Sequence, residues 1–336
     1  MAEIERQPKP PSVTAREIAK RIFRHENAVL AGILIALVAG LAAMTRGLTV
    51  SRENVTNIML QSSARGMASI GQAFVILTGN IDIAVGGMAL VSAVLGSAMM
   101  TSRLWQNIAG APVPMGVGVL VMLLAGCGLG MFNALFVSRL RVPSLIVTLA
   151  MWRMSFGGAY QISAGNTIIE LPRSLAFFGQ GYIAGVPVSV IMFVAVAAVA
   201  YFILYHTTYG RSVYAVGGNP VSAWLSGITV PRVIFSVFVI SGFLAALAAV
   251  ITTSRCLTAS MVTLKGLEID SIAAVCIGGV SLFGGRGSLI GVIIGVIIIG
   301  VINNGMNVLG VEASFQELAK GAIILSAVTI DVIRRR

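Results

Sequence analysis

The feature that most constrains the fold is a series of long apolar runs that recurs along nearly all of the 336 residues. Most of these runs approach the roughly 20 residues that an α-helix needs to cross a bilayer. A segment that crosses a membrane must satisfy its own backbone hydrogen bonds, which favours helices. We therefore predict an all-α, polytopic membrane protein with about ten transmembrane helices. The expected spans are 28–44, 55–78, 83–100, 115–137, 143–162, 186–205, 233–253, 267–282, 289–303 and 318–333.

The composition leaves no material for a separate soluble domain. Hydrophobic residues make up 57% of the chain and charged residues 10%, whereas an ordinary soluble domain has about 25% charged residues. We expect a basic cytoplasmic tail at 1–27 and a single transmembrane permease domain at 28–336, surrounded by membrane lipid. The net charge of +11 fits basic loops beside membrane helices, so no nucleic-acid partner is expected.

The distribution of Lys and Arg predicts the orientation. Ten is an even number of spans, so both termini are expected on one side of the membrane. The tails and loops on that side carry 14 basic residues, against 7 on the other. Because basic loops are retained in the cytoplasm, both termini are predicted to be cytoplasmic.

Two polar, glycine-containing breaks are expected to interrupt spans, one in each half of the chain, at 78–82 and 284–288. Irregular backbone at membrane depth is tolerated only where it is buried in protein or lines a cavity, and paired breaks are typical of the path through a repeat-built transporter. Intramembrane polar and charged side chains mark such paths as well. The candidate path residues are Gln72, Asn80, Asp82, Arg153, Glu268 and Asp270.

Some of these side chains have a structural alternative. Glu268 and Asp270 stand two residues apart, about 200° around a helix, so at most one of them is expected to line the path. Arg65 and Arg153 either pair with acids across the bundle or line the path, and these alternatives stay open. Lys320 lies near a helix end and is expected to reach the membrane surface.

The sequence contains no recognisable catalytic site. There is no Gly-Lys dipeptide and hence no P-loop for ATP, and the only two histidines, His25 and His206, cannot serve a nucleophile between the later helices. The three cysteines have no metal-binding spacing. We expect a transport protein that is not an enzyme and binds no cofactor or metal, so that any ATP is used by a partner.

The longest loop on the basic side, 206–232, is predicted to contain a short capped helix, Pro220–Ser226. Asn219 suits the N-cap, Pro220 the first helical position, and Gly227 the position just after the end. Such a helix can take force from a partner ATPase. It can equally rest on the membrane surface. The candidate coupling residues are Asn219, Pro220, Ala223, Trp224, Leu225 and Gly227.

Several ordered motifs resemble those of the ribose-type permeases of bacterial ABC sugar importers. They are Gly71–Gln72, Leu77–Gly86, Ala215–Pro220, Ser226–Ile228, Gly266–Ala274, Gly278–Gly279, Gly284–Gly287 and Asn303–Gly305. The resemblance implies a ten-helix subunit of the inner membrane that dimerises with an identical or a related copy. It further implies that a periplasmic binding protein delivers a monosaccharide and that a cytoplasmic ABC ATPase drives transport.

This chain departs from the family pattern at a few positions. Asn80 stands where the family usually has Gly, Trp224 stands where the coupling helix usually has Arg, and Arg153 precedes the usual arginine position by nearly one helical turn. The particular sugar is therefore left open. Two alternatives remain: a permease for branched-chain amino acids or nucleosides, and a proton-coupled carrier that uses Asp82, Glu268 or Asp270.

Overall fold

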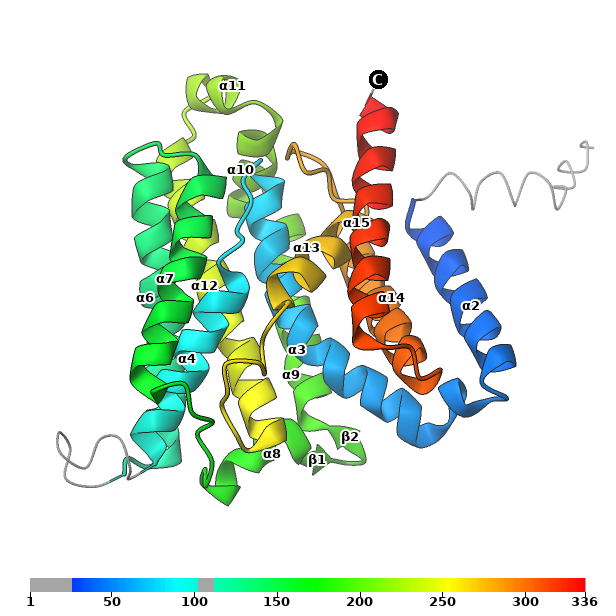
Figure 1. Ribbon diagram of the computed structural model, residues 1–336. Coiled ribbons are helices and arrows are strands. Elements are labelled where there is room, and N and C mark those ends of the chain that lie inside the picture. The colour runs from blue at the N-terminus through cyan, green and yellow to red at the C-terminus, as the bar shows by residue number, and fades with distance from the viewer. Residues whose placement is uncertain (1–25, 102–111, 336) are drawn as a thin grey trace, which may run out of the picture.

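The computed structural model describes residues 26–101 and 112–335, so the predicted tail at 1–27 lies almost wholly outside the described residues. The described chain forms a helical bundle (Figure 1), and the all-α prediction is confirmed. Within these ranges, paired strands are limited to one two-residue hairpin and an isolated bridge between Ile168 and Ala259. The elements are α2 (Glu26–Met44), η1 (Leu48–Val50), α3 (Arg52–Leu77), α4 (Val85–Met100), α6 (Met115–Ser138), α7 (Ser144–Ser163), η2 (Arg173–Leu175), α8 (Ala176–Gln180), β1 (Tyr182–Ile183), β2 (Val186–Pro187), α9 (Val188–His206), α10 (Thr208–Gly218), α11 (Pro220–Leu225), α12 (Val230–Cys256), α13 (Leu267–Ile277), α14 (Leu289–Val308) and α15 (Ala313–Arg335).

A helix lies in each of the predicted ranges, but the helices differ in length and polarity. Among the described residues, α2, α6, α9, α12 and α14 are long and apolar enough to cross a membrane by length and composition. The helix α13 has only 11 residues, which corresponds to roughly 16 Å, about half of a hydrocarbon core. The residues before it, 257–266, form no regular helix, and Ile168 and Ala259 exchange backbone hydrogen bonds of 2.8 and 3.0 Å there.

The centre of the bundle is α12, which packs against α6, α3 and α4. Glycines allow α6 and α12 to approach closely. A Cβ atom at Gly126 would clash with the carbonyl oxygen of Gly242, and one at Gly130 would lie 2.6 Å from the carbonyl oxygen of Phe238. Small residues at such crossings are how membrane helices gain packing contacts.

The two polar breaks connect helices and do not interrupt them, which corrects the prediction of two interrupted spans. Residues 78–84 join α3 to α4, and residues 278–288 join α13 to α14. Glycines in both connections adopt positive φ, with values of 77° at Gly79 and 83° at Gly284. The backbone turns sharply at both places because glycine has no Cβ atom to forbid this conformation.

The bundle has two distinct ends (Figure 1). One end carries α10, α11, the start of α2 and the C-terminal end of α15. The opposite end carries α8 and the β1–β2 hairpin. At that second end the side chain of Gln180 donates a 2.9 Å hydrogen bond to the carbonyl oxygen of Arg255 near the end of α12.

Candidate functional site

The predicted capped helix in the 206–232 loop is present as α11, one residue shorter than expected. The side-chain oxygen of Asn219 accepts hydrogen bonds of 3.0 Å from the backbone N–H groups of Val221 and Ser222. At the other end Gly227 adopts a φ of 84°, and the N–H of Ile228 donates to the carbonyl oxygen of Ala223 at 3.0 Å. These caps satisfy groups that a two-turn helix would otherwise leave unpaired, so α11 is held in shape by its own local sequence.

One side of α11 packs on the protein and the other is uncovered. Ala223 is buried, whereas Val221, Trp224 and Leu225 are 66%, 65% and 72% exposed, and we call these three residues the α11 surface. Figure 1 shows α11 projecting beyond the neighbouring ends of α6 and α7. An exposed Trp on a projecting element is typical of the aromatic anchors that bind a partner protein.

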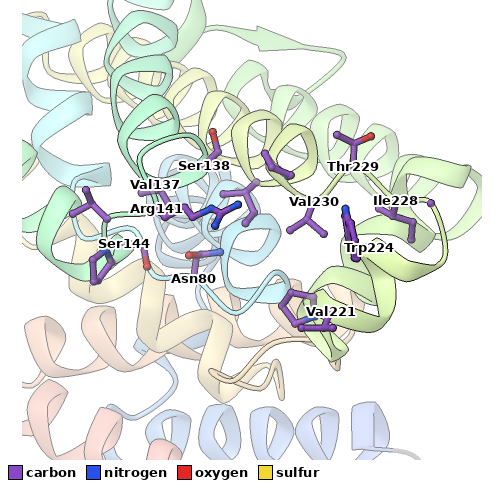
Figure 2. Close-up of a pocket in the computed structure, with 16 residues that line it drawn as sticks. Asn80, Val137, Ser138, Arg141, Ser144, Val221, Trp224, Ile228, Thr229 and Val230 are labelled. Carbon is purple, nitrogen blue, oxygen red and sulfur yellow. The ribbon is translucent and has the colours of Figure 1, made fainter.

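A groove of about 890 Å³ lies beside α11 (Figure 2). Trp224 and the segment Gly227–Ile234 form one wall, while the end of α6, the α6–α7 connection and Asn80 form the other. Asn80 donates a 3.1 Å hydrogen bond to the hydroxyl of Thr78. The structure therefore places Asn80 at the α11 end of the bundle, in the connection that also holds Asp82.

Three segments that are distant in sequence meet beneath α11 through their glycines. We call this contact the glycine junction, and its residues are Gly79, Gly217, Gly218, Gly284 and Gly285. The N–H of Gly285 donates a 2.9 Å hydrogen bond to the carbonyl oxygen of Leu77. A Cβ atom at Gly217 would clash with that oxygen and would lie 2.5 Å from the nitrogen of Gly285. The junction links the last turn of α10 to both connections that follow α3 and α13.

Gln72 and Asp82 lie together inside the bundle and are fully buried. The carboxylate of Asp82 accepts a 2.8 Å hydrogen bond from the hydroxyl of Ser241 and a 3.0 Å hydrogen bond from the N–H of Ala84. The amide of Gln72, oriented to satisfy its neighbours, bonds to the backbone of Asp82 at 3.0 and 3.3 Å. In this conformation both side chains hold the 78–84 connection against α3 and α12, and neither is open to a path.

Asp270 is the centre of an ion-pair network between helices. The Nε of Arg65 lies 3.0 Å from its carboxylate, the Nζ of Lys320 lies 3.8 Å from it, and Asn303 donates a hydrogen bond to it. Of the two alternatives for Arg65, the structure therefore shows pairing with an acid across the bundle. Lys320 points into the bundle and also pairs with Glu317 at 2.9 Å, which corrects the prediction that it reaches the membrane surface.

We expect this network to stabilise the packing of α3, α13 and α15. Replacing Asp270 by Asn should lower the stability of the purified protein by about 3 kcal/mol, because the half-buried Arg65 would lose the only acid that pairs with it among the described residues, while Lys320 would keep Glu317. The matched control is Glu317→Gln, at a side chain that is 67% exposed, which should change stability by less than about 1 kcal/mol. Denaturation in detergent measures both variants. Equal effects of the two substitutions would contradict the structural role of Asp270.

Glu268 lies on a different side of α13 from Asp270, as the two-residue spacing predicts. Its Oε1 accepts a 3.2 Å hydrogen bond from the indole N–H of Trp152 on α7, and a Cβ atom at Gly86 on α4 would clash with its Oε2. The guanidinium carbon of Arg153 lies 5.0 Å from the centre of the Trp152 ring. Among the six candidate path residues, the structure therefore brings Gln72 together with Asp82, and brings Arg153 near Glu268 through Trp152.

The sequence reasoning missed Trp152 and Ser241 as partners of these charged residues. Trp152 directly precedes the candidate path residue Arg153, and this adjacency could have identified Trp152 from the sequence. Ser241 lies within the apolar run of α12, where nothing in the local pattern points to the distant Asp82. Only the packing of α12 against the 78–84 connection brings them together.

Comparisons with known proteins give one family and several relatives. Residues 54–328 match a family model described as "Branched-chain amino acid transport system / permease component". The ribose import permease protein of Bacillus subtilis is 38% identical over 284 residues, which cover 83% of this chain and 84% of that protein. The D-allose transport system permease protein of Escherichia coli is 35% identical over 89% of each chain, and the fructose import permease protein of Rhizobium meliloti is 35% identical over 89% of this chain and 84% of its own. No solved structure gives a significant match.

The family model covers most of the chain, including α11, the glycine junction and the Trp152–Arg153–Glu268 neighbourhood. Its description names a transport component, and these three relatives are named as permeases. The chain therefore belongs to this family of transport-system permease components and is a multi-pass membrane protein.

Proposed function

We propose that the chain is the membrane subunit of an ATP-driven ABC importer that carries a monosaccharide delivered by a periplasmic binding protein. The observation that carries the proposal is the shared substrate class of the relatives: proteins named for ribose, D-allose and fructose each align with more than four fifths of the chain. The three sugars differ from one another, so the comparison supports the class and leaves the individual sugar to experiment.

The partner ATPase would bind on the cytoplasmic side at the α11 surface. Asn219, Pro220 and Gly227 give α11 its shape, and the buried Ala223 attaches it to the rest of the protein. This leaves Trp224 and Leu225 free for a groove of the ATPase. The glycine junction beneath α11 would then carry the closing motion of the ATPase toward α4 and α14.

All ten predicted spans would cross the membrane, with both termini in the cytoplasm. The short α13 would be completed by residues 257–266, whose backbone at Ala259 is paired within the protein as irregular backbone at membrane depth must be. The placement of α2, α10, α11 and the C-terminal end of α15 at one end of the bundle supports this arrangement (Figure 1). The excess of Lys and Arg assigns that end to the cytoplasm.

This topology predicts that Cys256 faces the periplasm. It is the last residue of α12, it is exposed, and it lies at the end of the bundle opposite α11. After Cys127 and Cys276 are replaced by Ala, a membrane-impermeant maleimide should label Cys256 in cells with a permeable outer envelope. Labelling that requires rupture of the inner membrane would reverse the proposed orientation.

The translocation path would run along the outer face of α7, between this chain and a second identical or related copy. Arg153 lies near the middle of α7, it is exposed, and among the described residues it has no acidic partner within 4 Å. An unpaired guanidinium in the hydrocarbon layer is strongly disfavoured. This face of α7 is therefore better suited to a water-filled path between subunits than to lipid.

Two other functions can be compared with this proposal. The family description favours a branched-chain amino acid as the alternative substrate. A proton-coupled carrier needs an accessible carboxylate, whereas Asp82 is bonded to Ser241 and Ala84, and Asp270 is paired with Arg65. The importer is favoured because it assigns a role to the exposed α11 surface, which a self-sufficient carrier would not need.

Uptake into proteoliposomes tests the proposal directly. The chain would be reconstituted with its cognate ATPase and binding protein, and radiolabelled ribose, allose, fructose and leucine would be compared with and without ATP. We expect uptake of one or more of the sugars that depends on ATP and on the binding protein and is insensitive to an uncoupler. Uptake of leucine alone, or uptake that an uncoupler abolishes, would overturn the proposal.

A further inference from the structure

An aromatic ring and a cation lie side by side on the α7 face. Trp152 is half-buried and Arg153 is exposed, with the guanidinium 5.0 Å from the ring centre. This distance is within the range of an attractive cation–π contact. The face of Arg153 continues with Gly157, where an added Cβ atom would meet nothing within 4 Å. The pair therefore borders open space near the middle of a helix expected to span the membrane.

The ring of Trp152 is held in one orientation from two further directions. Its indole N–H donates the 3.2 Å hydrogen bond to Glu268, and the ring of Phe156 packs against it at a centroid distance of 4.9 Å. Glu268 is only 5% exposed, and its Oε2 has no hydrogen-bond partner within the described structure. A carboxyl group buried in this way is costly unless it has a function, and here it fixes the position of the indole.

These groups match the surface of a monosaccharide. A sugar ring has an apolar face of C–H groups and an edge of hydroxyls. A Trp ring offers a flat apolar surface, and an Arg guanidinium offers five N–H donors in a planar fork that hydroxyl oxygens can accept. Both groups are present here, on neighbouring residues, and a packed carboxyl group orients one of them.

We propose that Trp152 and Arg153 form a contact site for the sugar partway along the translocation path, and that Glu268 is the positioning residue that orients Trp152. The inference rests on the proposed function and deepens it, because it names the residues that meet the substrate after the binding protein has released it. The site lies on the outer face of α7, so the facing surface is supplied by the second copy.

The experiment compares sugar uptake with ATP hydrolysis in the complete reconstituted complex. The variants are Arg153→Gln, Trp152→Leu and Trp152→Phe, and Arg173→Gln, an exposed arginine outside the spans, serves as the control. Arg153→Gln and Trp152→Leu should each lower the number of sugars carried per ATP by up to about 10-fold, since each removes one contact of the size of a hydrogen bond or a ring contact. The rate of ATP hydrolysis stimulated by the binding protein should stay within about 2-fold of the wild-type rate, because a 2-fold change corresponds to only a small free-energy difference.

Substrate preference separates a sugar contact from a purely structural role. Trp152→Phe keeps an aromatic surface but loses the indole N–H, so it should shift the ratio of uptake rates for two stereoisomeric sugars while total uptake largely survives. Glu268→Leu keeps the ring and removes its orienting hydrogen bond, so it should shift the sugar preference as Trp152→Phe does, and Glu268→Gln should restore much of the wild-type preference because an amide oxygen can still accept the indole hydrogen bond.

The outcomes decide between the two hypotheses. If the wild-type complex carries sugar and these variants change neither the sugar-to-ATP ratio nor the preference between sugars, the contact site is wrong and the proposed function stands. Loss of uptake and ATP hydrolysis together, with lowered thermal stability in all the variants, would also overturn the contact site, since it would show a packing role. If the wild-type complex carries only leucine, the proposed function fails and the inference fails with it.

Discussion

Replacing Gly217 by Ala is expected to abolish most transport and to lower the thermal stability of the protein. The added Cβ atom would be forced between the carbonyl oxygen of Leu77 and the N–H of Gly285, which are joined by a 2.9 Å hydrogen bond. Both neighbours are backbone atoms and cannot rotate away. Overpacking costs about 1–3 kcal/mol and the broken buried hydrogen bond adds about 1–3 kcal/mol. We expect uptake to fall at least about 10-fold, because the glycine junction connects α10 to the rest of the bundle.

The adjacent residue provides a matched control. A Cβ atom at Gly218 would meet nothing within 4 Å, and Gly218 ends α10 without a positive φ. Gly218→Ala should therefore change stability by no more than about 0.5 kcal/mol and leave uptake intact. Thermal unfolding in detergent and uptake by proteoliposomes measure both variants. Equal behaviour of the two alanine variants would show that the glycine junction is not tightly packed.

Replacing Trp224 by Ala is expected to weaken the binding of the ATPase and leave the fold intact. Trp224 is 65% exposed at the tip of the bundle, so its removal opens no cavity in the protein. A buried aromatic anchor at an interface can contribute ~2 kcal/mol or more, which corresponds to about 30-fold in affinity. Sugar uptake should decrease in parallel. Co-purification of the ATPase with the variant, normalised to the amount of protein in the membrane, measures the effect.

Tyr182 is a suitable control for Trp224. It is 56% exposed in the β1–β2 hairpin at the opposite end of the bundle (Figure 1). Tyr182→Ala should leave the association with the ATPase unchanged. Full association and transport in Trp224→Ala would rule out the α11 surface as the ATPase contact. Failure of Trp224→Ala to accumulate in the membrane would show that the side chain supports the fold instead.

The local sequence was sufficient to predict those features of the structure that depend only on residues adjacent along the chain. The helix α11 was predicted to within one residue because Asn219, Pro220 and Gly227 supply its caps and its first helical position from adjacent residues. The placement of Glu268 and Asp270 on different sides of α13 followed from helical periodicity. The long apolar runs likewise located the helices, since length and hydropathy are properties of a single segment.

The tertiary structure decided which distant residues meet. The pairing of Asp270 with Arg65 and Lys320, the burial of Asp82 against Ser241, and the separation of Asn80 from Arg153 all depend on how helices cross. The glycines at 79, 217 and 284 lie in motifs that the sequence shows, but the sequence did not predict that they meet in one junction. A glycine leaves space for another backbone, and its motif does not specify which backbone fills that space. The sequence by itself therefore determined an all-α membrane protein with a short capped helix in its 206–232 loop. Packing alone determined which charges are paired inside it and which, like Arg153, have no acidic partner among the described residues.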